Sequence, residues 1–91
     1  MQEIRVEKQP TKERLQELGV AGWDIWTKEI SRFSWHYDEQ EICYLLEGSV
    51  LVTPENGQAV HIGEGDLVTF PKGMSCTWEA RAPVRKHYRF G

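Results

Sequence analysis

The chain alternates between apolar and polar residues over a series of short segments, which is the pattern of strands with one buried and one solvent-facing side. The clearest case covers residues 31–38, where Phe33, Trp35 and Tyr37 take every second position and polar residues stand between them. Two further apolar strands are predicted over residues 41–47 and 49–53. Gly48 separates them, and we expect it to break the run because glycine punctuates strands.

The rest of the chain predicts more short strands and one helix. The strands are expected around residues 4–6 and over 21–27, 58–62, 67–70, 75–80 and 84–90, with a corner at 81–83. Residues 12–18 are predicted to be helical, because Thr11 can cap the start of this segment and Gly19 its end. Many short strands divided by Gly and Pro indicate an all-β barrel or sandwich.

Length and composition exclude several classes of protein. Ninety-one residues make one domain, which we place over residues 1–91. The net charge is −3 and no basic cluster stands out, so we expect no nucleic-acid partner. No apolar run approaches the ~20 residues of a membrane span, and the charged N-terminus is unlike a signal peptide. Cys43 and Cys76 form no CxxC motif, which favours free thiols in a reducing cytoplasm.

Two spacings in the chain resemble the two sequence motifs of the cupin superfamily. Glu41 and Gly48 stand seven residues apart, as the glutamate and glycine of the first motif do. Gly65, Pro71 and Gly73 keep the spacing of the second motif, and Cys76 stands where that motif has a histidine. In detail the chain is most similar to the ureidoglycine aminohydrolase-like cupin domains, through Trp35-His36-Tyr37, Leu46-Glu47-Gly48 and Arg85-Lys86-His87-Tyr88.

The resemblance implies a fold and a place for the site. The fold would be an all-β antiparallel jelly-roll barrel with one short N-terminal helix, its site inside the barrel, and small cupins commonly form homodimers. In the ureidoglycine aminohydrolases a carboxylate, two imidazoles and an amide hold a metal. This chain departs from that set at all four positions, so neither the metal nor the deamination can be carried over.

The side of the first aromatic strand that faces inward decides the character of the site. The first motif tolerates two spacings, so its histidine positions fall either on Ser34 and His36 or on Trp35 and Tyr37. Only one parity of a strand can face the interior. Burial stabilises by ~2 kcal/mol per aromatic side chain. We therefore expect Trp35 and Tyr37 to point inward and His36 outward.

This orientation predicts a poor metal site. Trp35, Tyr37, Glu41 and Cys76 would face the interior, whereas divalent metals of the cupin type prefer imidazole and carboxylate ligands. We expect no tightly bound metal cofactor. If a divalent metal does bind, the ligands would be Glu41, Cys76 and His36.

The last strand adds a lysine to the interior. Val84, Lys86 and Tyr88 share one parity, so an inward Tyr88 brings Lys86 with it. A lysine on an apolar face needs a carboxylate partner, and Glu41 is the candidate. Tyr37 and Tyr88 would then be hydrogen-bond donors near the pair. Trp78 shares the parity of Cys76 and would line the same cavity.

Each of these residues also has a purely structural interpretation. Glu41 could be a solvated acid at a strand end, and Lys86 could reach into water with its ammonium group. Cys76 could be a small buried apolar residue. Trp35 and Trp78 could belong to the core, because large aromatic side chains dominate small cores.

Three functions are consistent with the sequence. The first is a small-molecule-binding cupin whose pocket holds Glu41, Cys76 and ligand-contacting aromatics, namely Trp35, Tyr37, Trp78 and Tyr88. The second is an enzyme, metal-dependent or Cys/Glu-dependent, that acts on a small nitrogen-containing metabolite with Glu41, Cys76 and Lys86 as catalytic residues. The third is a structural dimer partner with a vestigial pocket.

Overall fold

The computed structural model describes residues 3–91; Met1 and Gln2, which the predicted domain includes, lie outside the described residues. The described chain is mostly β, with one α-helix and one 3-10 turn. Its elements are β1 (Arg5–Lys8), α1 (Lys12–Leu18), η1 (Val20–Gly22), β2 (Asp24–Lys28), β3 (Ser31–His36), β4 (Glu41–Pro54), β5 (Val60–Gly63), β6 (Asp66–Phe70) and β7 (Ser75–Phe90).

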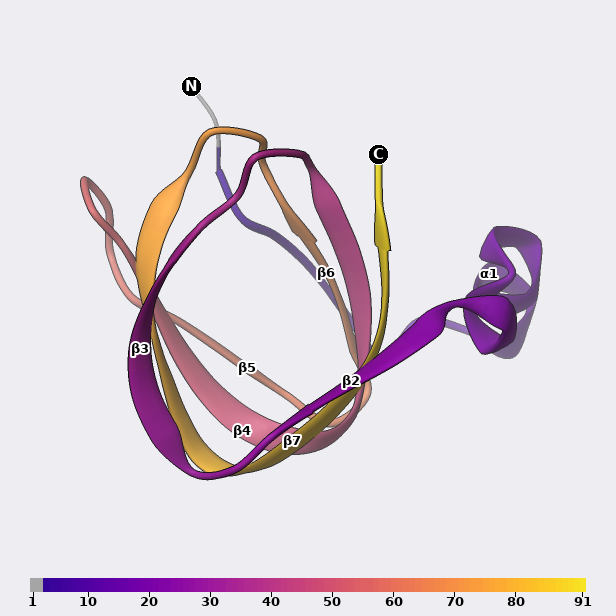
Figure 1. Ribbon diagram of the computed structural model, residues 1–91. Helices are drawn as coiled ribbons and strands as arrows, with labels where there is room; N and C mark the ends of the chain where they lie inside the picture. Colours follow the sequence, from indigo (N-terminus) through magenta and orange to yellow (C-terminus); the bar gives the residue numbers. More distant parts are fainter. Residues whose placement is uncertain (1–2) are drawn as a thin grey trace.

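All strand pairs are antiparallel and belong to one sheet that is organised by its two long strands. β4 and β7 pair along nearly their whole length. β4 also pairs with β6 through residues 41–44 and with β5 through residues 49–52. β7 pairs with β3 through residues 75–80 and with β2 through residues 84–88. The strands curve around a common interior, and α1 lies outside it (Figure 1).

Two predicted interruptions of the strands are wrong. β4 runs through Gly48 and β7 runs through residues 81–83 without a break. The β4–β7 register shifts three times between Leu45 and Val50, and Ser49 lies opposite Ala82. Gly48 in β4 and Pro83 in β7 therefore mark one bend that the two paired strands share. Pro83 is tolerated there because it falls between the β3-paired and β2-paired parts of β7, where a ladder N–H is not required.

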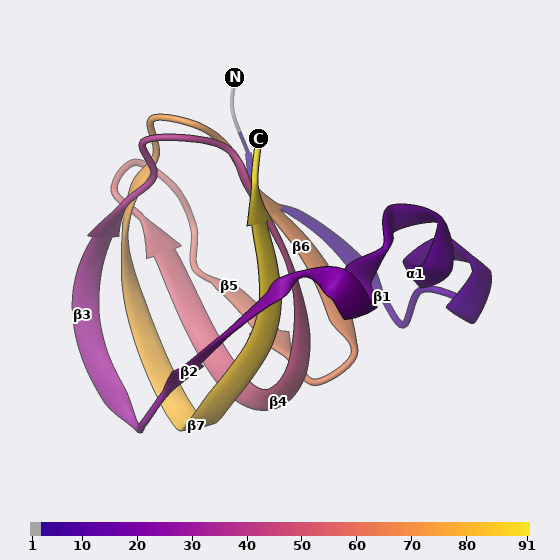
Figure 2. The same ribbon diagram turned by 45° about the vertical axis from the view of Figure 1, so that its right-hand side comes forward.

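The helix forms over the predicted residues and stands on the surface of the sheet. Thr11 Oγ1 accepts a hydrogen bond from the Arg14 N–H at 3.2 Å, and Gly19 ends the helix with φ 71°. No residue of α1 is buried. In the rotated view of Figure 2, α1 lies beside β1 and away from β3. No helix within residues 3–91 is long and apolar enough to cross a membrane.

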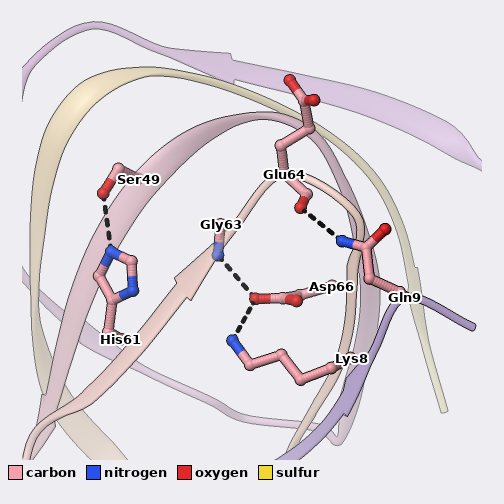
Figure 3. Close-up of polar contacts among 7 residues, drawn as sticks. All are labelled: Lys8, Gln9, Ser49, His61, Gly63, Glu64 and Asp66. Atoms are coloured by element: carbon pink, nitrogen blue, oxygen red, sulfur yellow. Dashed lines mark hydrogen bonds and ion pairs between the residues drawn. The ribbon is translucent and has the colours of Figure 1, made fainter.

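A polar network around Asp66 fastens β1 to β6 (Figure 3). Asp66 is buried, and its Oδ2 accepts hydrogen bonds from Lys8 Nζ and from the Gly63 N–H, both at 2.8 Å. Gln9 Nε2 donates to the Glu64 carbonyl at 3.3 Å. Gly65 has φ 87°, and a Cβ atom there would stand 2.2 Å from Gln9 Nε2. Gly65, the first glycine of the second motif, thus allows a tight turn and the close approach of the Gln9 side chain.

The interior of the curved sheet is the core. Its largest fully buried side chains come from β3–β4, β5, β6 and β7, and they are Trp78, Tyr37, Phe70, Leu45, Ile62, Val50, Val52, Val68 and Cys43. Tyr37 lies just after β3 and stacks on Phe70, with ring centroids 4.8 Å apart and planes 7° from parallel. The inward direction predicted for Tyr37 is therefore the one observed.

Candidate functional site

An inner cavity of about 250 Å³ lies among β2, β3, β4 and β7. Most of its lining is aromatic, and two charged side chains complete it. The lining residues are Trp26, Phe33, Trp35, Tyr37, Glu41, Trp78, Lys86, Tyr88 and Phe90. At ~30 Å³ per water molecule, a cavity of this volume has room for a small organic molecule with a few fused or linked chemical groups, but not for a polymer chain.

Glu41 and Lys86 form a buried ion pair inside this cavity. The Lys86 Nζ donates to Glu41 Oε2 at 2.5 Å, and the two side chains are only 6% and 4% exposed. Lys86 lies opposite Leu45 rather than opposite Glu41, so the two long side chains bridge the distance along the strands. The pairing expected from strand parity is present. Neither a solvated acid at position 41 nor a lysine with its ammonium in water agrees with this burial.

Two indole rings enclose the lysine. The Lys86 Nζ lies 4.9 Å from the ring centroid of Trp26 and 4.7 Å from that of Trp78. An ammonium over a desolvated indole face gains up to ~2 kcal/mol from the ring quadrupole. This gain offsets part of the cost of taking the pair out of water. Trp26 faces Lys86 because the two residues lie directly opposite each other in the β2–β7 register.

Tyr37 is held as a neutral phenol beside the pair. Its hydroxyl accepts a hydrogen bond from Trp78 Nε1 at 3.1 Å. Burial raises its pKa well above the ordinary value, and the nearby Glu41 carboxylate raises it further. Because the oxygen accepts from the indole, the O–H proton remains free to donate. The predicted hydrogen bonds from Tyr37 and Tyr88 to the pair are not among those that the described residues form.

Trp35 and His36 take opposite sides of β3. Trp35 lines the cavity but is 46% exposed, so it forms part of the mouth and not of the core. His36 is exposed, with its Nδ1 2.7 Å from Ser75 Oγ and its Nε2 3.7 Å from Asp38 Oδ1. The imidazole therefore shares no ligand position with Glu41.

Cys76 is a buried thiol outside the lining of the inner cavity. It belongs to a second hollow that Trp35, His36 and Ser75 also line. Burial, and then the Glu41 carboxylate, raise the pKa of Cys76 to about 11. Burial raises the pKa of Cys43 to about 12. Both thiols are free, and each stays protonated at neutral pH, where it is a weak nucleophile.

Three lining residues were not predicted as site residues. Phe33 has the parity of Trp35, and Phe90 has the parity of Lys86, so alternation along the strands would have indicated both. No pattern pointed to Trp26. Its part in the site arises from the pairing of β2 with β7, which only the fold reveals.

The donor atoms around the cavity do not fit a divalent metal. Residues 3–91 hold no group of three or more His, Cys, Asp and Glu side chains arranged to bind an ion. The carboxylate of Glu41 already faces the Lys86 ammonium. A metal there would have to displace that cation and find its remaining ligands among indole and phenyl rings, which supply none.

Comparison with solved structures finds closely similar folds. A DUF861 family protein from Thermotoga maritima is 54% identical and has a TM-score of 0.95, over 98% of this chain and all of that one. A putative ethanolamine utilization protein Q from Salmonella typhimurium LT2 is 29% identical, with a TM-score of 0.65 over 72% of this chain and 53% of that one. The EutQ protein of Clostridium difficile is 21% identical, with a TM-score of 0.67 over 96% and 66% of the two chains, which shows the fold alone.

The sequence comparison agrees with the structural one. No protein with a curated description matches the chain. The model of the EutQ-like cupin domain matches residues 15–88, which include both predicted motifs and every lining residue of the inner cavity except Phe90. The chain therefore belongs to the family of EutQ-like cupin domains.

Proposed function

We propose that this protein binds a small organic molecule in the inner cavity without the help of a metal ion. The observation that carries the proposal is the cavity of about 250 Å³ with aromatic walls and the Glu41–Lys86 pair inside it. Ligand pockets are typically apolar concavities with a few placed polar groups, and this one has that composition.

The ion pair itself favours a binding role over a purely structural one. A buried pair seldom stabilises a fold more than apolar residues of the same volume would. Here the pair stands beside open space that aromatic side chains surround. Trp35 and Phe90, 46% and 47% exposed, leave the apolar rim of that space in contact with solvent.

An enzyme that uses Cys76 as its nucleophile is the alternative, and two observations speak against it. The thiol has a pKa of about 11 and is therefore not a thiolate at neutral pH. It also belongs to the second hollow, whereas Glu41 lines the inner cavity. Glu41 and Lys86 already carry a carboxylate base and an ammonium acid, but each is engaged by the other in the ion pair, which weakens both in these roles.

We also infer the type of β-barrel, the cellular compartment and the oligomeric state of the protein. The curvature of the sheet, with β4 and β7 each shared between two short strands, supports a jelly-roll barrel of the cupin type. Two free buried thiols support a reducing, cytoplasmic setting. β1 leaves one side unpaired within residues 3–91, and this edge supports a homodimer.

The proposal is tested by a titration of the metal-free protein with a library of small aromatic compounds. The indole N–H signals of Trp26 and Trp78 are followed by NMR, because both rings line the cavity. We expect some compounds to shift both signals. Replacement of the mouth residue by Trp35→Ala should weaken this binding, because that ring lines the cavity.

The matched control is Ile30→Ala, which removes another exposed apolar side chain, 64% exposed, that is not in the lining. It should leave the affinity unchanged. Metal analysis of protein purified without a histidine tag should find no stoichiometric ion. A stoichiometric metal, or a library in which no compound moves either indole signal, would contradict the proposal.

A further inference from the structure

We infer that the inner cavity selects uncharged molecules with one polar end that both donates and accepts hydrogen bonds, such as a carboxamide or lactam, on a flat apolar body. The inference rests on the binding function proposed above and narrows the class of ligand. It follows from the charge, the free hydrogen-bonding capacity and the depth of the groups that line the cavity.

The charges of the cavity disfavour ions of either sign. The charges of Glu41 and Lys86 sum to zero, and both side chains are nearly excluded from solvent. An anion would be attracted by the Lys86 ammonium but repelled by the Glu41 carboxylate, whose Oε2 lies 2.5 Å from the Lys86 Nζ. A cation would be attracted by the carboxylate and repelled by the ammonium. Either would also lose its hydration against aromatic walls. The space between Trp26 and Trp78, where an organic cation would gain most, already holds the lysine ammonium.

The ion pair retains free hydrogen-bonding groups of both kinds, N–H donors on Lys86 and an acceptor oxygen on Glu41. An ammonium has three N–H donors, and Lys86 uses one of them on Glu41 Oε2. Within residues 3–91 the carboxylate forms no other hydrogen bond, yet no fully buried side-chain nitrogen or oxygen lacks a partner. The second oxygen of Glu41 is therefore reachable from the cavity. A carboxamide presents a carbonyl for the ammonium and an N–H for this oxygen, and the free Tyr37 O–H adds a donor to the carbonyl.

The depth of the lining residues gives the ligand its direction. Glu41 and Lys86 are 3% and 5% exposed, whereas Trp35 and Phe90 at the mouth are nearly half exposed. The polar end of the ligand is therefore the deep end, and a flat apolar body lies among rings nearer the mouth. A sugar would leave hydroxyl groups against these rings without partners. A zwitterion would have to open the pair and lose the hydration of two charges.

Benzamide, benzoate, benzamidinium and phenylglycine test the inference, because they carry the same ring with a neutral, anionic, cationic or zwitterionic end. Each is titrated into the protein at pH 7 while the indole signals of Trp26 and Trp78 are recorded. We expect benzamide to bind at least roughly tenfold more tightly than the other three. Glu41→Gln should move the preference toward benzoate, and Lys86→Met should move it toward benzamidinium, since each leaves one charge without its partner.

The outcomes separate this inference from the proposed function. If a charged probe shifts the indole signals and binds as tightly as benzamide, the cavity is a binding site but the inferred class is wrong. If none of the four probes shifts either signal, the inference fails, and the library titration decides whether the site fails with it. If a single variant does not fold, the double variant Glu41→Gln/Lys86→Met removes both charges together. It should bind benzamide more weakly than the unmodified protein, and equal affinity would overturn the inference.

Discussion

At the scale of single residues, a lysine stands against the carboxylate where a cupin metal site would need a cation. The glutamate of the first motif is present, but its counter-charge is the Lys86 ammonium at 2.5 Å. An ammonium neutralises the carboxylate without offering open coordination positions, so it cannot act as a Lewis acid toward a bound molecule. The cavity offers a bound molecule hydrogen-bonding groups and contact with aromatic rings.

The two thiols should be unreactive in the folded protein. Cys76, with a pKa of about 11, and Cys43, with a pKa of about 12, should be alkylated by iodoacetamide much more slowly than in urea at pH 7.5. The variant Cys76→Ser isolates the reaction of Cys43. Alkylation of native Cys76 as fast as that of the unfolded chain would show that its pKa is not raised.

The raised pKa values of the two thiols also predict how the stability of the protein changes at alkaline pH. The ordinary thiol pKa is 9.0, and the folded values lie above it. The unfolded chain therefore loses these protons first, and stability that is fully present below pH 9 falls as the pH rises toward 11 to 12. Urea unfolding at a series of pH values should show this fall, and Cys76→Ser should make it smaller.

At the scale of secondary-structure elements, β4 and β7 show how local signals can be correct and yet misassigned. Gly48 and Pro83 each predict a break, and each does mark a point where backbone geometry changes. The structure brings the two positions together: a Cβ atom on Gly48 would lie 3.1 Å from Val84 Cα and 3.2 Å from the Pro83 carbonyl. Each signal alone resembles a turn, but the pair of them forms one bend in two hydrogen-bonded strands.

This close approach predicts a large cost for a side chain at position 48. Gly48→Ala should lower the free energy of unfolding by roughly 2–4 kcal/mol, because φ 124° is strained for alanine and the added methyl crowds β7. Gly19→Ala is the matched control, since its φ of 71° is also positive but nothing lies within 4 Å of the new Cβ. It should cost only about 1–2 kcal/mol. Equal losses in urea unfolding would rule out crowding at the bend.

At the scale of the whole molecule, stability should be unevenly distributed over the sheet. β4 and β7 pair with each other and with four shorter strands, whereas among residues 3–91 α1 has no buried residue and β1 pairs only with β6. Local opening requires little loss of buried area at such edges and much at the centre. Hydrogen exchange followed by mass spectrometry should find the slowest amides in β4 and β7 and the fastest in α1. Protection of α1 equal to that of β7 would contradict this order.

Much of the fold could be predicted because its signals are local. The ends of α1 follow from Thr11 and Gly19, and the strands follow from alternation with Gly and Pro between them. The site was predictable in part for the same reason. Parity correctly gave the directions of Tyr37, His36 and Lys86, because a strand has only two faces. Parity also placed Trp35 on the inward face, but its half exposure at the mouth was not foreseen, and neither was the position of Trp26 over the lysine.

The sequence by itself determined which side chains share a face of each strand, where the helix begins and ends, and that the two motif spacings belong to a cupin. The sequence also named Glu41 as the partner of Lys86. The tertiary structure decided that two indole rings enclose this pair and that Cys76, on the same face of β7, falls outside the cavity lining. The physical reason is that alternation fixes only the face of a residue. The curvature of the whole sheet sets the distance between residues that lie far apart along its strands.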